Sequence, residues 1–277
     1  MSRQVGYLGP PGSFGEQAAL GYAPAGALVP FTSHGAVVAA IGSGLIEEGL
    51  AAVENSLAGT VPETVDAIIQ TEGVFIRGEL ILPIEHCLIA APGTSLAAVD
   101  LVLSHPSALA QCRTYLETHL PGARLEAALS TAAAVETAVQ TRAAAAIGTR
   151  RAASLRGGAI LAAAVQDVAQ NSTRFVVLAA SDAPPTGDDK TSFAFTVDHD
   201  RPGTLIGVLS ELSNRQINLT RIESRPSREE LGVYVFMIDC QGHREDAVVA
   251  EALGAVQKQA HYFRLFGSYP RYADAAT

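Results

Sequence analysis

Short apolar runs alternate with helical patterns through the first 180 residues of the chain. Strand-like runs occupy residues 5–8, 27–31, 50–53, 101–103 and 144–148, and helical patterns begin at Phe14, His34, Pro62, Pro106 and Thr149. This alternation is typical of parallel sheets whose faces are covered by helices. The units are too many for one small sheet, so we expect an α/β fold with two parallel-rich lobes and a cleft between them. Two alanine-rich stretches, residues 132–134 and 143–146, predict close packing of helix on sheet.

A polar segment at residues 181–189 divides the chain into two regions of different texture. It contains two prolines and a glycine, which is typical of a linker. Beyond it we expect a strand at 192–197, a helix at 203–215, strands at 218–224 and 232–240, a helix at 245–257 and a strand at 262–266. The order βαββαβ is that of ferredoxin-like modules. We therefore predict domains at residues 1–180 and 191–272, joined by a linker at 181–190.

The composition favours a soluble globular protein and excludes several functions. The 277 residues are 48% hydrophobic and 17% charged, which is enough to build a buried core. A formal net charge of −9 argues against nucleic acid binding. Cys87, Cys112 and Cys240 are far apart and form no CxxC pattern, so neither a disulfide framework nor a metal site is predicted. No apolar leader or stretch of transmembrane length occurs, so we expect a cytoplasmic protein without membrane contact.

The segment Asn171-Ser172-Thr173-Arg174-Phe175 places a hydroxyl, a permanent cation and a ring directly before an apolar run. In open α/β sheets, chemistry gathers at strand ends and at the loops beside them. The first lysine is Lys190, so the region before it must bind anions with arginine, histidine or backbone N–H groups. Arg174 suits a carboxylate because its planar guanidinium can bind both oxygens. A structural ion pair with an acidic side chain is the alternative.

Two polar turns follow earlier strand-like runs. The turn at residues 9–14 carries Ser13, which could hold a carboxylate at a helix N-terminus or simply cap that helix. Glu54, Asn55 and Ser56 follow the third strand-like run. They fit a substrate loop or an ordinary polar turn.

Hydroxyl and imidazole groups stand at two later boundaries between strand and helix. His105 and Ser107 flank a proline, where His105 either donates to a ligand or has a structural, capping role. Ser130 and Thr131 either bind an anion or cap the next helix.

The second region has its own pair of candidate binding segments. Glu223-Ser224-Arg225-Pro226 ends a strand, and residues 201–205 open a helix. Together they could line a small pocket for an amino-acid-sized ligand, or they could be a turn and a helix start of an ordinary α+β module.

Five motifs occur in order in the first region: Gly9-Pro10-Pro11-Gly12-Ser13-Phe14, Val53-Glu54-Asn55-Ser56-Leu57-Ala58-Gly59, Ser104-His105-Pro106, Ala108-Leu109-Ala110-Gln111-Cys112 and Thr173-Arg174-Phe175. This series resembles that of the prephenate dehydratase family. Gly203-Thr204-Leu205 and Glu223-Ser224-Arg225-Pro226 resemble the ACT regulatory domain of the same enzymes. The resemblance covers almost the whole chain. With no helical domain ahead of Val5, it is closest to the monofunctional form rather than to a fusion with chorismate mutase.

The resemblance implies an activity and an assembly. The reaction converts prephenate to phenylpyruvate, water and carbon dioxide in L-phenylalanine biosynthesis, without a cofactor or a metal. The implied fold is a bilobed catalytic domain similar to periplasmic binding proteins, followed by the ACT domain. The implied assembly is a homodimer through side-by-side ACT domains, or a tetramer, with L-phenylalanine as an inhibitor at the dimer interface.

The resemblance also implies roles for individual residues. Thr173 would contact the departing hydroxyl, Glu54 would supply a proton and Asn55 would orient the substrate. Phe175 would pack beside the substrate ring or anchor its strand. With Phe175, the implied substrate-binding residues are Arg174, Ser13, Ser56, Ser130, Thr131, His105, Ser107 and Gln111. The implied phenylalanine site comprises Gly203, Leu205, Asn218, Leu219, Glu223, Ser224, Arg225 and Pro226.

Three positions depart from the family pattern. Ser107 stands where the family commonly has glutamine, which shortens or removes one contact to substrate, and Gln111 lies one helical turn further on. Gly15 replaces a residue with a hydroxyl, and Ala52-Val53 replaces the proline usual before Glu54.

Two other functions are compatible with the sequence. Arogenate dehydratase carries out the same elimination on the amino-acid analogue of prephenate, and a few pocket contacts decide between the two substrates. A non-catalytic amino-acid sensor would use the same lobes and ACT module, but it gives no reason for Thr173 beside Arg174.

Overall fold

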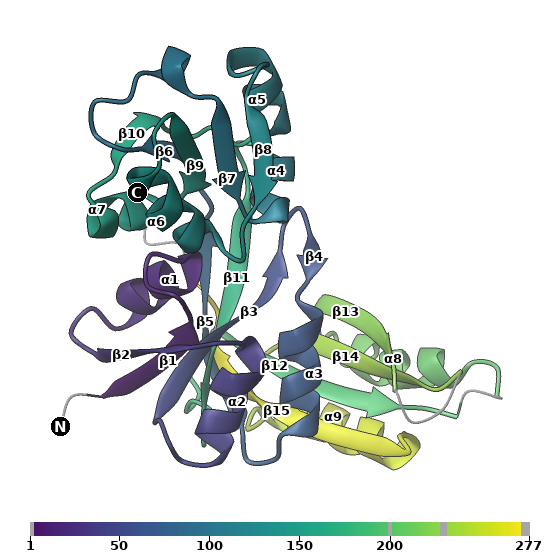
Figure 1. Cartoon of the computed structure of the whole chain (residues 1–277). Coiled ribbons are helices and arrows are strands. Elements are labelled where there is room, and N and C mark those ends of the chain that lie inside the picture. The colour runs from purple at the N-terminus through teal and green to yellow at the C-terminus, as the bar shows by residue number, and fades with distance from the viewer. Residues whose placement is uncertain (1–2, 199–200, 228–231, 273–277) are drawn as a thin grey trace. The chain divides into compact units, whose positions relative to one another are not determined.

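The computed structural model describes residues 3–198, 201–227 and 232–272 (Figure 1). Up to residue 90 the elements are β1 (Gln4–Leu8), α1 (Phe14–Tyr22), β2 (Ala27–Phe31), α2 (His34–Gly42), β3 (Glu48–Asn55), β4 (Gly59–Thr60), α3 (Pro62–Gln70), β5 (Phe75–Pro83) and β6 (Cys87–Ala90). A 3-10 turn at Leu96–Ala98 is followed by β7 (Leu101–Ser104), α4 (Pro106–Gln111), α5 (Arg113–His119), β8 (Arg124–Ala127), α6 (Thr131–Gln140), β9 (Ala144–Gly148), α7 (Arg150–Arg156), β10 (Ala159–Ala162) and β11 (Ser172–Ala179). The α/β class expected for this region is confirmed.

The strands of this region belong to two sheets, of which only part is parallel. One sheet has the order β2-β1-β3-β11-β5, with β4 paired to β3, and the other has the order β10-β6-β9-β7-β8. In the second sheet β7 is parallel to β8 and β9, whereas β6 is antiparallel to β9 and β10. The second sheet is therefore mixed rather than parallel throughout.

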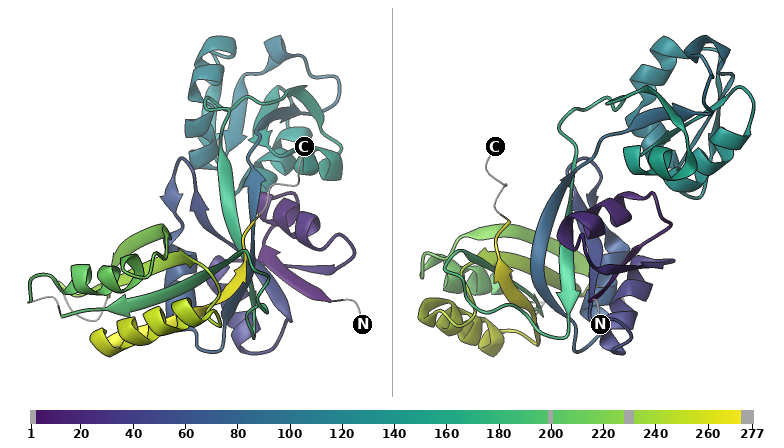
Figure 2. Two further views of the ribbon diagram at one scale, coloured as in Figure 1. Left: turned by 180° about the vertical axis from the view of Figure 1, so that it is seen from behind. Right: turned by 90° about the vertical axis from the view of Figure 1, so that its left-hand side faces the viewer.

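The C-terminal region has the expected βαββαβ order. Its elements are β12 (Asp189–Thr196), α8 (Thr204–Ser213), β13 (Leu219–Pro226), β14 (Tyr234–Gln241), α9 (Ala247–Gln259) and β15 (Tyr262–Pro270). The sheet order is β13-β14-β12-β15, and every pair is antiparallel. Figure 2 shows α8 and α9 together on one face of this sheet. The core between them includes Phe193, Phe195, Leu212, Ile238 and Val256, all fully buried.

The chain divides into two compact units, each made of several stretches of sequence. One unit contains the residues up to 37 together with 49–62 and 81–175. The other contains 38–48, 63–80 and the residues from 176 onwards. The second unit thus combines the ferredoxin-like module with α3, most of β5 and the end of β11.

Alanines allow α6 to pack closely on the second sheet. Ala132 and Ala134 of α6 are buried, and Ala144, Ala145 and Ala146 of β9 are fully buried. A Cβ added at Gly148 would lie only 2.4 Å from a methyl carbon of Val135. The predicted close contact between these alanine-rich stretches is confirmed, and it explains why larger side chains are absent from them.

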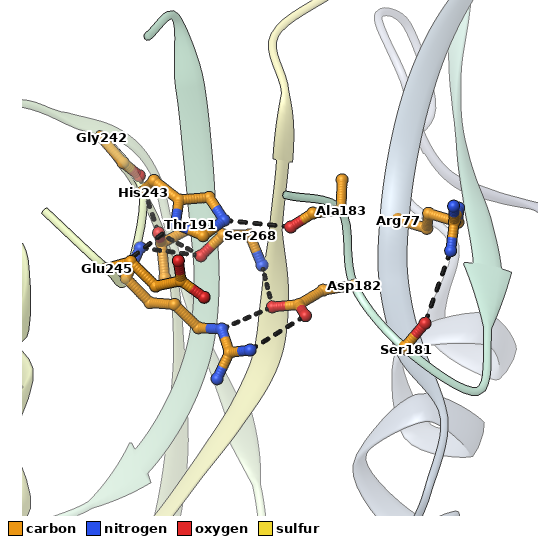
Figure 3. Close-up of polar contacts among 10 residues, drawn as sticks. Arg77, Ser181, Asp182, Ala183, Thr191, Gly242, His243, Glu245 and Ser268 are labelled. Carbon is orange, nitrogen blue, oxygen red and sulfur yellow. Dashed lines mark hydrogen bonds and ion pairs between the residues drawn. The ribbon is translucent and has the colours of Figure 1, made fainter. Parts of the chain in front are cut away.

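The predicted linker is held tightly against the C-terminal module (Figure 3). Asp182 accepts a hydrogen bond from the Ser268 backbone N–H at 3.0 Å and pairs with Arg244 at 2.7 Å. The Ala183 N–H donates to the Ser268 carbonyl, and the Ala183 carbonyl lies 3.0 Å from His243 Nε2. The strand β12 already begins at Asp189. Little of the segment is therefore free chain.

Charged side chains join the C-terminal module to the earlier segments of the same unit. Lys190 Nζ lies 2.8 Å from Glu79 of β5, and the carboxylate of Glu79 is almost fully buried. Arg264 of β15 donates to the carbonyls of Ile69 and Thr71 at the end of α3. Separating a buried ion pair leaves an unpaired buried charge, which is strongly unfavourable. The Lys190 contact therefore holds the module on β5, and the Arg264 contacts hold it on α3.

The packing of α1 on β1 yields a first prediction. A Cβ at Gly15 would lie 2.4 Å from the Leu8 carbonyl oxygen, whereas a Cβ at Gly21 of the same helix meets nothing within 4 Å. Gly15→Ala should therefore lower the free energy of unfolding by about 1–3 kcal/mol. Gly21→Ala should raise it by up to about 1 kcal/mol, because alanine favours helix. Urea unfolding of both variants checks this, and equal effects would contradict the contact.

Candidate active site

The end of β3 and the start of β11 meet at the side chain of Asn55. Its Nδ2 lies 2.8 Å from Asn171 Oδ1, 2.9 Å from Thr173 Oγ1 and 3.2 Å from the Ser172 carbonyl oxygen. Its Oδ1 accepts the backbone N–H groups of Leu57 and Ala58, at 3.0 and 2.9 Å. Both ends of this amide are thus used, and Thr173 has a defined hydrogen-bond donor.

Ser56 joins the same two segments through its backbone and its hydroxyl group. The Ser56 N–H donates to the Ser172 carbonyl at 2.9 Å, and the Ser172 N–H donates to Ser56 Oγ at 3.0 Å. This two-way bond resembles one step of a sheet ladder with a side chain in place of a carbonyl. It fixes the start of β11, so Ser56 holds the strand that carries Thr173.

A chain of side-chain hydrogen bonds continues from Asn171 to α4 and to the segment before β6. Asn171 Nδ2 donates to Gln111 Oε1 at 3.0 Å, and His86 Nε2 lies 3.0 Å from the same oxygen. Gln111 ends α4, and His86 lies between β5 and β6. The motifs pointed to Gln111 and included Asn171, but nothing in the sequence pattern singled out His86. The ring of Phe14 meets the His86 ring edge-on, with centroids 5.4 Å apart.

The turn before α1 binds a carboxylate that belongs to the chain itself. Glu16, only 6% exposed, accepts the Gly12 N–H at 2.7 Å and pairs with Arg151 at 3.2 Å. Ser13 caps α1, because its Oγ accepts the Glu16 N–H at 3.2 Å and donates to the Leu8 carbonyl at 2.9 Å. Ser13 therefore has the capping role that the sequence left as an alternative to anion binding.

Thr149 joins this turn to α7. Its hydroxyl donates to the Gly12 carbonyl at 2.7 Å and accepts the Ala152 N–H at 2.9 Å as the cap of α7. Gly12 has a φ of 93° and its added Cβ would lie 3.1 Å from Ala152. Only glycine fits both the left-handed backbone and the close approach.

The other N-terminal candidates lie at the starts of α4 and α6. His105 is exposed and caps α4, with its Nδ1 2.7 Å from Ser107 Oγ. Ser130 caps α6 by accepting the Ala133 N–H at 3.1 Å, and half-buried Thr131 begins that helix. These caps follow β7 and β8, at the carboxyl ends of strands, where ligand sites of α/β sheets form.

Thr173, Arg174 and Phe175 lie inside β11 rather than ahead of it. Successive side chains of a strand point to opposite faces, so Thr173 shares a face with Phe175 and Arg174 shares one with Ser172. Thr173 is 9% exposed and Phe175 is 3% exposed, whereas Arg174 is half-buried. The burial of Phe175 fits the anchoring role better than a contact with a ligand.

Burial sets the protonation of the groups nearest the amide chain. It lowers the pKa of His86, so this imidazole is neutral at pH 7. Burial raises the pKa of Cys87, and it raises the pKa of Cys112, next to Gln111, to about 12. Neither thiol forms a thiolate nucleophile near neutral pH. Within residues 3–198, 201–227 and 232–272, no group of three or more His, Cys, Asp or Glu side chains could hold a metal ion.

The proposed effector residues fall into two groups. Gly203 caps α8 with a φ of 87°, Leu205 follows it in α8, and Asn218 and Leu219 lie at the start of β13. Arg225 binds Asp66 of α3 through Nε at 2.9 Å and Glu223 through a terminal nitrogen at 3.2 Å. Ser224 and Pro226 are exposed on alternate positions of the same strand. Arg225 therefore connects the Glu-Ser-Arg-Pro motif to a helix outside the module.

Comparison with known proteins defines the class of this fold and site. The model of the prephenate dehydratase family matches residues 5–183, and that of the ACT domain matches residues 194–257. The chain belongs to the prephenate dehydratase family, with an ACT domain after the dehydratase region. The resemblance inferred from the motifs is confirmed. Among the described helices, none is long and apolar enough to span a membrane.

Individual relatives match nearly the whole of this chain. A prephenate dehydratase of Mycobacterium sp. (strain KMS) is 40% identical over 281 residues, covering 96% of this chain and 89% of its own. The bifunctional chorismate mutase/prephenate dehydratase of Aquifex aeolicus (strain VF5) is 39% identical, covering 97% of this chain and 74% of its own.

Solved structures share the fold. The prephenate dehydratase of Arthrobacter aurescens, determined in complex with L-Phe, has a TM-score of 0.89 at 33% identity and covers 97% of this chain and 90% of its own. GqqA, described as a novel type of quorum quenching acylase, has a TM-score of 0.88 at 30% identity and covers 98% of each chain.

The internal carboxylate of the first turn yields a second prediction. Glu16→Gln removes the charge that Gly12 and Arg151 bind, and this should cost about 1–3 kcal/mol of unfolding free energy. Glu117→Gln breaks the exposed Arg113–Glu117 pair of α5 and should cost at most about 0.5 kcal/mol. Urea unfolding of the two variants measures the difference. Similar losses of unfolding free energy in the two variants would show that burial does not strengthen the contacts of Glu16.

Proposed function

We propose that this protein catalyses the decarboxylating dehydration of prephenate to phenylpyruvate, a step of L-phenylalanine biosynthesis, in the cytoplasm. Membership of the family and the 40% identity to a prephenate dehydratase support this substrate. The fold alone does not decide the reaction, since a structure described as an acylase shares it. The observation that carries the proposal is the hydrogen bond from Asn55 to Thr173, in the middle of the family motifs.

The chemistry asks little of the protein beyond binding and one proton. The ring carboxylate leaves as carbon dioxide, its bonding electron pair enters the ring, and the ring C–O bond breaks. The departing hydroxide takes a proton and leaves as water, while the ring becomes aromatic. The protein must therefore bind a dianion, orient it and stabilise the departing hydroxyl in the transition state.

Thr173 is the proposed donor to the departing hydroxyl. Its oxygen already accepts from Asn55 Nδ2 at 2.9 Å, so its single O–H is directed away from that amide. A threonine hydroxyl is too weak an acid to supply the proton alone, so it acts as a hydrogen-bond donor or a relay. Half-buried Glu54, next to Asn55 in β3, is the proposed source of that proton.

Arg174 is the principal proposed ligand for a substrate carboxylate. Its planar guanidinium can bind both carboxylate oxygens, and Ser13, whose hydroxyl caps α1, is the second proposed ligand. The remaining proposed substrate contacts are Phe175, Ser56, Gln111, His105, Ser107, Ser130 and Thr131. Arogenate differs from prephenate only in its side chain, so the ratio of kcat/KM on the two substrates decides between them.

Removing the Thr173 hydroxyl gives a third prediction. Thr173→Ala should lower kcat by about 10²–10³-fold, as expected when one donor to a developing charge is lost. KM should change little, because the substrate carboxylates bind elsewhere. Thr173→Ser keeps the hydroxyl and should retain much of the activity. Phenylpyruvate formation is followed by ultraviolet absorbance, and near-normal turnover of Thr173→Ala would exclude the role.

For regulation, we propose that L-phenylalanine inhibits the enzyme at the ACT domain. The structure of the Arthrobacter aurescens relative with L-Phe supports an effector of this chemistry. The proposed ligand residues are Gly203, Leu205, Asn218, Leu219, Glu223, Ser224, Arg225 and Pro226. We place the catalytic domain at residues 1–180, the linker at 181–190 and the ACT domain at 191–272.

The proposed assembly is a homodimer or tetramer through ACT domains. Strand β13 lies at an edge of its sheet, and Ile222 on it is 50% exposed. The unpaired N–H and C=O groups of an edge strand are a ready template for pairing with another chain.

Coupling between the two regions is proposed to run through Arg225 and Asp66. Asp66 lies on α3, which begins at Pro62, two residues after β4. The loop between β3 and β4 carries the Leu57 and Ala58 N–H groups that orient Asn55. An effector that changes the partners of Arg225 would thus bias the segment leading to Asn55. Such coupling requires different affinities for two states.

Breaking this ion pair gives a fourth prediction. Asp66→Asn should raise the phenylalanine concentration needed for half-inhibition by about 5–10-fold, within the usual range of coupling energies, and leave uninhibited turnover nearly unchanged. Glu72→Gln removes an exposed carboxylate just beyond the same helix and should leave inhibition unaltered. Activity and molecular mass are measured with and without phenylalanine. Identical inhibition in Asp66→Asn and wild type would remove this route.

A further inference from the structure

The hydrogen bonds around Asn55 have a direction that can be read from one end. Leu57 and Ala58 present backbone N–H groups, which can only donate, so the Asn55 atom that faces them must be oxygen. The nitrogen of Asn55 then faces Thr173 and Asn171. Both of those partners must therefore accept. The orientation of Asn55 follows from covalent chemistry and needs no choice between alternative amide positions.

The same logic fixes every later member of the chain. Asn171 accepts from Asn55 with its oxygen, so its nitrogen faces Gln111. Gln111 must then present its oxygen, which also lies 3.0 Å from His86 Nε2. An amide oxygen only accepts, so the proton of the imidazole must be on Nε2.

We infer that His86 is a positioning residue, whose Nε2–H fixes the orientation of Gln111 and Asn171 and thereby holds Asn55 against Thr173. This inference rests on the proposed function for its effect on turnover. The protonation of Nε2 does not depend on that function.

The surroundings of His86 suit a fixed neutral ring. The residue is 2% exposed. Its backbone N–H donates to Gln166 Oε1 at 2.9 Å, and its backbone carbonyl accepts the Val165 N–H at 2.9 Å. Its Nδ1 is buried and has no hydrogen-bond partner in the described parts of the chain. A proton on Nδ1 would therefore be buried without an acceptor, which is unfavourable. An unprotonated Nδ1 costs less to bury without a partner. The neutral ring therefore keeps its single proton on Nε2, where the Gln111 oxygen accepts it.

Loss of the Nε2 donor would change the position of Asn55 relative to Thr173. Without it, the Gln111 amide can rotate and present nitrogen to the Asn171 nitrogen. Asn171 would then turn its own nitrogen toward Asn55 Nδ2, and the Asn55 amide cannot flip in response because Leu57 and Ala58 donate to its oxygen. Two donors facing each other repel, so Asn55 would move away from Thr173. A displacement of about 1 Å at a reacting group can cost about 10²-fold in rate.

The variants separate a donor role from simple packing. His86→Leu fills the space without a donor, and kcat should fall by about 10²-fold, with KM within about threefold of wild type. His86→Gln places an amide nitrogen near the Nε2 position and should recover most of kcat. His243→Leu removes a fully buried histidine of the ACT domain and serves as the control for nonspecific loss of stability.

Nitrogen NMR of the wild-type protein tests the tautomer directly. With ¹⁵N-labelled histidine, the His86 signals among the seven histidines are assigned by their loss in His86→Gln. We expect Nε2 to be protonated and Nδ1 to be bare between pH 7 and pH 8. A proton on Nδ1 would overturn the inference, as would equal loss of kcat in His86→Leu and His86→Gln. If wild type fails to turn over prephenate, the proposed function falls while the NMR result still decides the tautomer.

Discussion

The carboxamide of Asn55 is the point through which the two halves of the candidate site depend on each other. Its oxygen is occupied by the loop that follows β3, and its nitrogen is shared between β11 and the polar chain leading to β6. No apolar side chain could make these contacts, and a carboxylate would lack the donor. The position of Thr173 is therefore set by hydrogen bonds in which the donor and the acceptor are fixed at each contact and cannot exchange roles.

Arginine and one lysine join the C-terminal module to α3 and β5. Lys190 is used on Glu79 in a largely buried pair, while arginines make the contacts of α3 with β13 and β15. Guanidinium groups can serve two acceptors at once, as Arg225 does with Asp66 and Glu223. The ACT sheet is thus connected to α3 by two guanidinium groups, each of which donates to two acceptors.

Hydrophobic periodicity predicted the α/β class and the ferredoxin-like order, because those features follow from where apolar side chains recur. Strand β5 was not predicted, since Arg77 and Glu79 interrupt its apolar pattern. Each charge is matched by a partner distant in sequence, Glu48 for Arg77 and Lys190 for Glu79.

The residues of the candidate site likewise divide into those that the sequence predicted and those that it did not. Asn55, Gln111 and Thr173 occur in recognisable motifs and were predicted. His86 depends on a three-dimensional chain of amides that no local pattern records. For the turn at residues 9–14 the sequence left anion binding and capping open; in the structure Ser13 caps α1 and the Gly12 N–H donates to Glu16 of the chain itself.

The segment between β11 and β12 has a mechanical consequence. It is bound at Ser181 by Arg77, at Asp182 by Arg244 and Ser268, and at Ala183 by Ser268 and His243 (Figure 3). Asp189 then gathers Thr186 and Gly187. A connector that is hydrogen-bonded at such short intervals cannot extend or rearrange without breaking these bonds. A displacement of the ACT sheet would therefore carry residues 176–179, the carboxyl end of β11, with it, because these residues and the sheet belong to the same compact unit.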